Sequence, residues 1–394
     1  MTHAMVHGVN FTNKGAELML YAIQQKLAEW DRKNTLSADT RTGTFQQRQA
    51  AGMKHLALRE PCKIPYSAQV FLAETIPSVL RNKLNLRLES EVDLVLDASG
   101  FAYSDECGLR RTEEMARLCR RWKQQGKKVV LLPQAFGPFS KALTGQYFPE
   151  IISHADLVFA RDKQSYLNIT ELGVPIDNVH IAPDFTNLVK GHVPDYARAL
   201  RQRACIIPNF RMIEKTSAEI RVSYIPFIAT LINTLEQHGL QPFILLHETN
   251  DVGLGQALME QLPHRVPLVN ETDPLAIKGI IGQSSLVVSS RFHGLVSALS
   301  QGVPSLGTGW SHKYQKLFQD YGCPDCLIDI GAGFEAARGQ LKRITDENSR
   351  RELRACLEHH AKQQNQLSQG MWAQVERLIS PSNSRTPDQA VVAV

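Results

Sequence analysis

The sequence predicts an α/β protein made of two doubly wound domains that face each other across a cleft. Short apolar runs alternate with amphipathic runs of helical length along most of the 394 residues. The runs 129–132 and 243–246 are apolar throughout, which is typical of parallel strands covered by helices on both faces. The length fits two domains, because a domain averages about 150 residues.

The first half alternates strands and helices up to residue 182. We expect strands at 5–9, 55–58, 93–97, 128–133, 157–160 and 179–182. We expect helices at 14–30, 70–84, 109–125 and 163–172. The polar stretch 38–52, rich in Thr, Gln and Arg, is expected to be a mobile loop. This alternation indicates βαβ units and therefore a parallel sheet.

The pattern restarts after a polar break with Pro and Gly at 190–195. We expect strands at 204–208, 242–247, 267–270, 286–289, 303–306 and 327–330. We expect helices at 217–238, 252–262, 274–282, 294–301 and 312–321.

The same pattern divides the chain into four parts. We predict an N-terminal domain over 1–195 and a C-terminal domain over 196–340. Residues 341–379 contain no strand candidate and are expected to form helices that pack back on the first domain. Residues 380–394 are expected to be a disordered tail.

The charge balance limits the kinds of partner. There are 44 Lys and Arg against 39 Asp and Glu, a net charge of +5. This excess is small for the length, so the sequence does not predict a nucleic-acid binder. It fits a small anionic ligand, and it leaves open peripheral contact with an anionic membrane.

The cysteines and the apolar runs bear on location. The seven cysteines are scattered, which favours a reducing compartment. We find no secretory signal pattern at the start and no apolar run near the ~20 residues that span a bilayer. We therefore expect a cytoplasmic protein, with any membrane contact peripheral at the inner face.

Ligands of doubly wound sheets bind at the carboxyl ends of the strands, where loops lead into helices. The strongest such site is 290–294, which reads Ser-Arg-Phe-His-Gly after the strand 286–289. Arg291, Gly294 and the helix N-terminus suit an anion such as phosphate or carboxylate. His293 is placed to donate a proton. The alternative is that Arg291 and His293 only brace the start of the helix.

Other strand ends add polar residues to the predicted cleft. Arg211 follows the strand 204–208 and is expected to point into the cleft. His312 and Lys313 open a later helix, although Lys313 could equally be a solvated surface residue. In the first domain, the polar residues after strands or at the start of the first helix are Asn10, Lys14, Glu17, Asp97, Gln134, Arg161 and Asp184. Asp97 could bind sugar hydroxyls, act as a general base or cap a turn.

Three motifs are discounted. The segment 331–336 matches G-x-G-x-x-A, but no strand follows its helix, so a dinucleotide site is not expected. The lone C-x-x-C at 323–326 does not predict a zinc site, and its role stays open. No Asp-x-Asp triplet occurs, so we expect no metal site.

Taken together in order, the motifs resemble those of the polysaccharide pyruvyl transferase family. The matching segments are 10–17, 93–100, 134–138, 160–162, 290–294, 302–305 and 312–314. The resemblance implies two Rossmann-like domains arranged as in GT-B glycosyltransferases. It implies transfer of pyruvate from phosphoenolpyruvate (PEP) to a sugar diol of a polysaccharide or its lipid-linked precursor, giving a cyclic ketal and phosphate. PEP is then the donor substrate, and no cofactor is implied.

The resemblance also implies roles for residues. It makes His293 catalytic, and it gives a cleft arginine such as Arg211 the task of holding PEP. We expect the donor, on the C-terminal side, to contact Arg211, Arg291, Gly294, His312 and Lys313. We expect the acceptor, on the N-terminal side, to contact Asn10, Lys14, Glu17, Gln134 and Arg161. Asp97 is expected to accept a hydroxyl proton.

Two other functions stay open at this point. A GT-B glycosyltransferase that uses a nucleotide sugar would share the architecture, and its anion site would hold a diphosphate. A catalytically silent relative would bind glycans as a scaffold. The sequence also leaves open a homo-oligomer.

Overall fold

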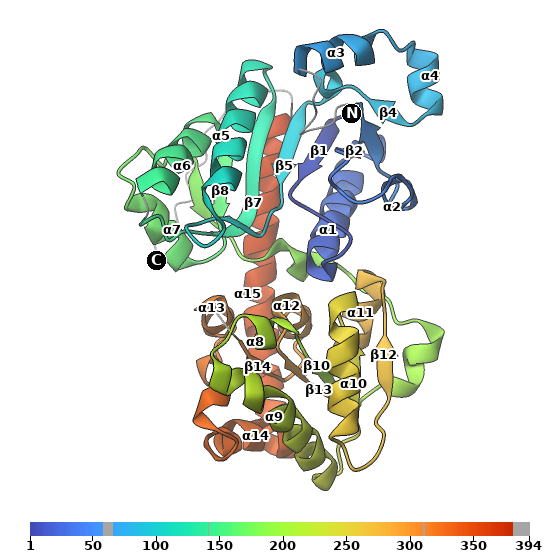
Figure 1. Ribbon diagram of the computed structural model, residues 1–394, viewed down its shortest axis with the longest axis vertical. Helices are drawn as coiled ribbons and strands as arrows, with labels where there is room; N and C mark the ends of the chain where they lie inside the picture. Colours follow the sequence, from blue (N-terminus) through green and yellow to red (C-terminus); the bar gives the residue numbers. More distant parts are fainter. Residues whose placement is uncertain (58–65, 141, 310–311, 381–394) are drawn as a thin grey trace.

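Two parallel β-sheets, one in each half of the chain, divide the molecule into two domains (Figure 1). The computed structural model describes residues 1–57, 66–140, 142–309 and 312–380. Helices flank each sheet, and the predicted α/β fold class is confirmed. The predicted tail lies outside the described residues from 381 onward.

The first sheet has the strand order β4-β3-β2-β1-β5-β7-β8-β9, and β6 pairs with β7. Its strands are β1 (His3–His7), β2 (Thr35–Ala38), β3 (Lys54–Leu56), β4 (Leu86–Arg87), β5 (Leu94–Asp97), β6 (Phe101–Tyr103), β7 (Lys128–Phe136), β8 (Leu157–Ala160) and β9 (Val179–Ile181). The strand order reverses between β1 and β5, and the loops after such strands are the expected ligand positions.

The helices of this domain are α1 (Lys14–Trp30), α2 (Phe45–Ala50), α3 (Tyr66–Glu74), α4 (Ser78–Lys83), α5 (Leu109–Gln124), α6 (Ala142–His154) and α7 (Lys163–Thr170). The prediction of a loop over 38–52 is wrong for its second half, which contains α2. Thr44 starts α2 with a capping box, in which its hydroxyl accepts from Gln47 N and the Gln47 side chain accepts from Thr44 N.

The second sheet has the strand order β12-β11-β10-β13-β14-β15, with the reversal between β10 and β13. Its strands are β10 (Ala204–Ile207), β11 (Pro242–Leu246), β12 (Leu268–Asn270), β13 (Leu286–Ser289), β14 (Ser305–Thr308) and β15 (Leu327–Ile328). Its helices are α8 (Arg211–Glu214), α9 (Ala218–Gln237), α10 (Val252–Glu260), α11 (Pro274–Gly282), α12 (Phe292–Leu299), α13 (His312–Asp320) and α14 (Arg338–Thr345).

The long helix α15 (Glu347–Ile379) runs behind both domains (Figure 1). Leu353 and Leu357, near its start, pack in the core of the C-terminal domain. Met371 and Trp372, near its end, pack in the core of the N-terminal domain. The Trp372 ring centroid lies 5.7 Å from that of Trp30 in α1. The helix therefore ties the two domains together.

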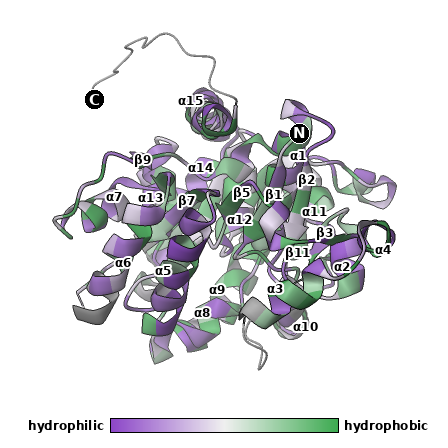
Figure 2. Cartoon of the chain, turned by 90° about the horizontal axis from the view of Figure 1, so that it is seen from above, coloured by the Kyte–Doolittle hydropathy of each residue, from purple (hydrophilic) through white to green (hydrophobic). Residues whose placement is uncertain are grey.

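The central strands of both sheets are apolar because helices cover them on both faces. Val95 and Leu96 in β5 and Val287 in β13 are 0% exposed. Figure 2 shows the hydrophobic residues gathered at the centre of the molecule and hydrophilic ones on outer helices such as α5. Among the described helices, none combines the length and hydrophobicity that crossing a bilayer requires.

Candidate active site

His293 stands where the two domains meet. It occupies the first turn of α12, directly after the loop that leaves β13. Its imidazole lies against the first turn of α1 in the other domain, since a Cβ built on Gly15 would come within 2.1 Å of His293 Nδ1. Glycine at position 15 therefore makes room for the imidazole.

Asp184 holds the other side of the same ring. It follows β9 in the N-terminal domain, and its Oδ2 lies 3.5 Å from His293 Nε2 and 3.5 Å from Arg161 Nη1. Oδ1 accepts hydrogen bonds from the backbone N–H of Thr186 (3.1 Å) and from its hydroxyl (2.6 Å). Burial alone would raise the pKa of Asp184, but His293, Arg161 and Thr186 together hold that pKa below its ordinary value. The carboxylate is therefore charged and fixed in place.

A buried hydrogen-bond network fixes the loop that presents His293. The Ser290 hydroxyl lies 2.7 Å from the Tyr224 hydroxyl and 2.5 Å from the Thr308 hydroxyl. The Ser290 carbonyl accepts from Asn209 Nδ2 (2.8 Å) and from the Tyr314 hydroxyl (3.0 Å). These partners come from four separate segments of the C-terminal domain, so the start of α12 has little freedom to move.

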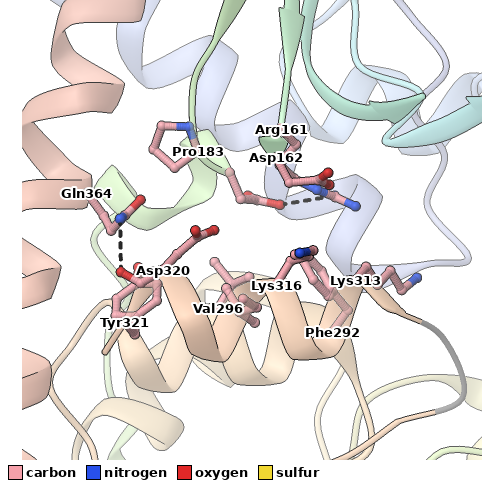
Figure 3. Close-up of a pocket in the computed structure, with 12 residues that line it drawn as sticks. Arg161, Asp162, Pro183, Phe292, Val296, Lys313, Lys316, Asp320, Tyr321 and Gln364 are labelled. Atoms are coloured by element: carbon pink, nitrogen blue, oxygen red, sulfur yellow. Dashed lines mark hydrogen bonds and ion pairs between the residues drawn. The ribbon is translucent and has the colours of Figure 1, made fainter. Parts of the chain in front are cut away.

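A pocket of mixed charge opens beside this ring, between the domains (Figure 3). It is lined by the cations Arg161, Lys313 and Lys316 and by the carboxylates of Asp162, Asp184 and Asp320. Its volume is about 370 Å³ with the open mouth included. Its lining includes Arg161 and Asp184 from the N-terminal domain and Phe292, Lys313 and Lys316 from the C-terminal domain. The Arg161 guanidinium lies 4.4 Å from the Phe292 ring centroid, and Lys313 Nζ lies 5.4 Å from it. Phe292 thus brings cations from both domains together.

Lys313 is a pocket residue whose pKa is strongly lowered. Burial, with the charges of Arg161 and Arg211 nearby, lowers the pKa of Lys313 to about 7. The side chains of Cys107 and Glu106 act in the opposite sense and raise the pKa of Lys313. Arg211 itself is exposed and pairs with Glu214 at 2.7 Å.

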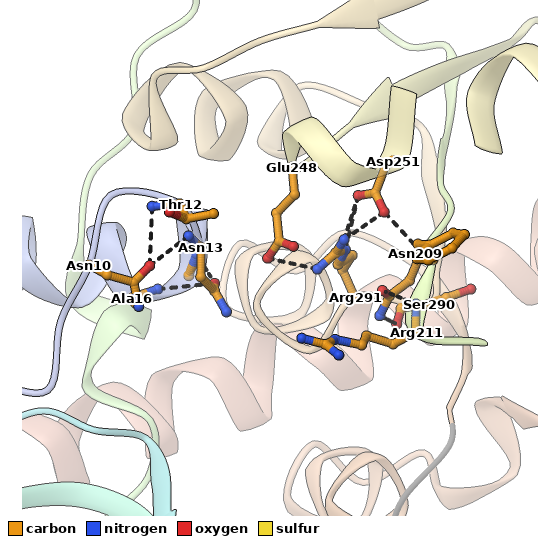
Figure 4. A network of polar contacts seen from close by, with 12 residues as sticks. Asn10, Thr12, Asn13, Ala16, Asn209, Arg211, Glu248, Asp251, Ser290 and Arg291 are labelled. Carbon is orange, nitrogen blue, oxygen red and sulfur yellow. Dashed lines mark hydrogen bonds and ion pairs between the residues drawn. The ribbon is translucent and has the colours of Figure 1, made fainter. Parts of the chain in front are cut away.

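Arg291 has a different surrounding from the one the sequence suggested. Its side chain is buried, and it makes a two-pronged ion pair with Asp251, with Nη2 2.6 Å from both carboxylate oxygens (Figure 4). Nη1 lies 2.7 Å from Glu248 Oε1. Because two carboxylates already neutralise this guanidinium, the geometry gives no support to the prediction that Arg291 holds PEP.

Gly294 and His312 complete the predicted donor group. A Cβ on Gly294 would come within 2.7 Å of Ser289 Oγ, so this glycine lets α12 pack against the end of β13. That role is internal packing and differs from the predicted approach of a ligand to the backbone. His312 begins α13, and its side chain lies outside what the structure describes.

The predicted acceptor residues at the start of α1 form a compact turn. Asn10 Oδ1 accepts from the backbone N–H groups of Thr12 (3.1 Å) and Asn13 (2.8 Å). Lys14 Nζ lies 2.7 Å from Glu17 Oε2. Burial is the main cause that raises the pKa of Glu17. These residues stand in the same turn as Gly15, and therefore next to His293.

A comparison with models of known protein families shows which family the chain belongs to. The model of the polysaccharide pyruvyl transferase family matches residues 13–312. The chain belongs to the polysaccharide pyruvyl transferase family. This match confirms the resemblance drawn from the motifs. A search of curated proteins gives no match.

Solved structures show the fold that this pyruvyl transferase shares. UDP-GlcNAc 2-epimerase from Neisseria meningitidis bound to UDP-GlcNAc is 12% identical, with a TM-score of 0.59, over 96% of this chain and 100% of that one. Anabaena HepE in complex with UDP and glucose is 13% identical, with a TM-score of 0.57 and the same coverage. The predicted GT-B-like arrangement is confirmed by these neighbours.

In this pyruvyl transferase, Asp97 and Gln134 lie inside the N-terminal domain. Asp97 is 0% exposed and accepts hydrogen bonds from Ser99 (2.6 Å), Tyr103 (3.1 Å) and Gln134 (2.7 Å). Gln134 is also 0% exposed. We therefore correct both expectations, because neither a hydroxyl proton nor a glycan reaches a carboxylate that three internal donors enclose.

The sequence analysis left two residues of this site without a role. Asp184 was one of several polar residues after strands, and nothing in the sequence showed that it would meet His293. His247 follows β11 and is buried, and its Nδ1 has no hydrogen-bond partner among the described residues. Burial, and then the charges of Arg291, His293 and Lys14, lower the pKa of His247, so this imidazole is neutral. The position of His247 directly after a strand was the sequence signal that could have placed it in the site.

No metal site accompanies these groups. Among the described residues, no three His, Cys, Asp or Glu side chains are grouped in a way that could hold a metal ion.

Proposed function

We propose that this polysaccharide pyruvyl transferase moves the pyruvate of phosphoenolpyruvate onto two hydroxyls of a sugar. The products are a cyclic ketal and inorganic phosphate. The observation that carries the proposal is the position of His293, held between Asp184 and the first turn of α1, beside a pocket to which both domains contribute cations and carboxylates.

The pocket suits the donor. PEP carries a phosphate and a carboxylate, so it needs several cations at short range. Arg161, Lys313 and Lys316 line the pocket, whereas Arg211 lines a separate pocket. Arg161, which we expected on the acceptor side, is therefore assigned here to the donor. Binding of a dianion would also favour the charged form of Lys313.

The first step is proton transfer to carbon. The protonated form of His293, which faces the Asp184 carboxylate, gives a proton to the methylene carbon of PEP. The carbon that carries the phosphate then becomes an oxocarbenium-like centre. One sugar hydroxyl adds to this centre, and its proton passes to the neutral His293, which thereby recovers the charged form.

The second step closes the ring. The C–O bond to phosphate breaks, and the cations of the pocket stabilise the departing charge. The second sugar hydroxyl adds to the same carbon, and its proton leaves with the phosphate. Two hydroxyl protons are thus lost, one to the new methyl group through His293 and one to phosphate. No separate carboxylate base is needed, which agrees with the burial of Asp97.

The acceptor would enter from the first turn of α1. This turn carries Asn10, Lys14 and Glu17 and lies next to His293 through Gly15. Polar groups there suit the hydroxyls of a sugar. The acceptor class we propose is a polysaccharide or its lipid-linked precursor.

Phosphorus NMR tests the donor directly. The protein is mixed with PEP or, separately, with UDP-sugars, in each case with candidate glycans. Phosphate released from PEP only when a glycan is present supports the proposal. UDP released from a UDP-sugar would instead identify a glycosyltransferase. No release from either donor with any glycan would favour a scaffold that only binds glycans.

A further inference from the structure

A lysine of the C-terminal domain is buried where the two domains meet. Lys278 lies on α11 and is 1% exposed. α11 stands at the end of the C-terminal domain that faces α1 (Figure 1), and its Leu275 packs against the core of the N-terminal domain. A lysine is rarely buried unless its ammonium has partners, because taking the charge out of water is costly. The partners of this ammonium therefore indicate its role.

The ammonium binds groups on both sides of the domain boundary. Lys278 Nζ donates to the carbonyl of Thr186 (2.9 Å), which lies in the 3-10 helix that Asp184 caps. It also donates to Ser300 Oγ (3.3 Å), directly after α12, the helix that carries His293 in its first turn. One side chain therefore joins the helix of the proposed proton donor to the turn that carries its carboxylate.

Contacts around α11 hold Lys278 in this position. Its carbonyl accepts from Gln301 Nε2 (3.0 Å). The backbone N–H of His192 donates to the Leu275 carbonyl (3.1 Å), so α11 is tied to the segment that leaves the N-terminal domain. A Cβ on Gly279 would collide with the carbonyl of His192, so glycine permits this close approach. The lysine therefore extends from a helix with little freedom to move.

The charge of the lysine adds to these hydrogen bonds. Burial lowers the pKa of Lys278 to about 8, and the charge of Asp184 acts against that lowering. The ammonium is therefore mostly charged at neutral pH. An apolar side chain of the same length would fill the space without the cost of burying a charge. Packing alone thus does not account for a cation at this position.

We infer that Lys278 is a positioning residue that holds the turn of Asp184 so that its carboxylate faces His293. The connection runs through Thr186. The carbonyl of Thr186 accepts from the ammonium, while its N–H and hydroxyl both donate to Asp184 Oδ1. Oδ2 then faces the imidazole at 3.5 Å. The effect of Lys278 on turnover rests on the proposed function, whereas its hold on the carboxylate does not.

Histidine-selective NMR tests this hold without any substrate. The full chain is produced with isotope-labelled histidine, and the imidazole signal of His293 is identified by its absence from His293→Ala. Asp184→Asn should move this signal, because the ring then faces a neutral amide. Lys278→Met should move it in the same direction, and the double variant should give the position found for Asp184→Asn alone.

Steady-state kinetics test the consequence for catalysis. Lys278→Met should lower kcat for acceptor-dependent phosphate release at least about tenfold, with KM for PEP within about threefold of wild type. In Asp184→Asn, where the charged partner is already lost, adding Lys278→Met should change kcat by no more than about twofold. Should Lys278→Met not fold, Lys278→Gln takes its place, because its amide keeps N–H donors without the charge.

Lys127→Met is the matched control. Lys127 is also a buried lysine, 3% exposed, and its ammonium also donates to backbone carbonyls, those of Glu89 (2.5 Å) and Val92 (2.9 Å). It directly precedes β7, at the sheet edge opposite the strand ends that form the site. Lys127→Met should therefore leave the His293 signal and the kcat per folded molecule as they are in wild type.

Two results would overturn the inference. One is a His293 signal that stays at its wild-type position in Lys278→Met. The other is a loss of kcat that is as large in the Asp184→Asn background as in wild type, because the lysine would then act independently of the carboxylate. If wild type releases no phosphate from PEP, the proposed function fails, while the NMR comparison still tests the role of Lys278.

Discussion

Asp184 of the N-terminal domain and His293 of the C-terminal domain face each other across the domain boundary, with 3.5 Å between Oδ2 and Nε2. This contact joins the residues after β9 to the first turn of α12. It couples the orientation of the proposed proton donor to the closure of the two domains. Several predictions about activity depend on it.

Replacing Asp184 with Asn should slow turnover more than it weakens donor binding. The amide keeps an oxygen for Thr186 but loses the charge that holds and stabilises protonated His293. We expect kcat to fall about 10²-fold, with KM for PEP changed only a few-fold. Steady-state kinetics of acceptor-dependent phosphate release measure both parameters.

Asp329→Asn is the matched control, since Asp329 caps a 3-10 helix as Asp184 does, but is exposed and follows the edge strand β15. Its kinetics should equal those of wild type. A variant Asp184→Asn with unchanged kcat would show that His293 does not need the carboxylate.

Gly15→Ala should damage the site by crowding His293. The new methyl group would lie 2.1 Å from His293 Nδ1, so the imidazole must move. A shift of about 1 Å at a reacting group costs about 10²-fold in rate. Thermal unfolding should show a modest loss of stability, because a methyl group forced into a packed contact costs about 1–3 kcal/mol and the helix preference of alanine offsets only part of it.

Gly370→Ala in α15 serves as the comparison, because a Cβ there meets nothing within 4 Å. It should keep full activity. If Gly15→Ala is as active as wild type, the contact between α1 and His293 has no part in catalysis.

Donor affinity should weaken as the pH rises through about 7. Burial lowers the pKa of Lys313 to about 7, so this lysine is charged at pH 6 and mostly neutral at pH 8. Since PEP is an anion, its affinity follows the charged form, and the apparent Kd should rise by at most tenfold per pH unit above pH 7. Isothermal titration calorimetry from pH 6 to pH 8 measures this.

The variant Lys313→Arg stays charged over that range, so its Kd for PEP should vary less with pH. The pH dependence of the Kd that remains in Lys313→Arg comes from titration of the PEP phosphate. Equal pH dependence in both proteins would remove Lys313 from the donor site.

Asp97→Asn should affect stability and leave the chemistry alone. Asp97 accepts from three internal donors, and an amide would turn a donor toward one of them. We expect a loss of about 2–3 kcal/mol in the free energy of unfolding, measured with urea. Turnover per folded molecule should stay within about twofold of wild type. A collapse of turnover in a fully stable variant would restore Asp97 as the base.

Sequence patterns predicted those strands and helices whose own residues form clear apolar runs or a clear helical periodicity. The predicted helices 14–30 and 274–282 coincide with α1 and α11, and the strand 286–289 coincides with β13. The prediction missed β2, β4 and β6, which are short, because pairing with neighbouring strands defines them more than their own apolar runs do. It also missed α6, which contains Pro149.

The location of the site could be predicted from the sequence, but the contacts of its side chains could not. The rule on strand ends identified the loop of His293 and the neighbourhood of Arg161, Asp184 and Arg211. It could not tell which way each side chain turns. Asp97 ends β5 yet turns toward Tyr103, and Arg291 turns toward Asp251, forty residues away in sequence. Such pairings depend on tertiary contacts that a single sequence does not display.

The most direct test of the account compares wild type with His293→Ala for two properties in the same buffer. Calorimetry gives the affinity for PEP, and phosphate release in the presence of an acceptor glycan gives turnover. We predict that His293→Ala binds PEP within about tenfold of wild type and releases phosphate at least about 10³-fold more slowly. A variant that binds PEP and keeps near-normal turnover would contradict the assignment of His293 as the proton donor.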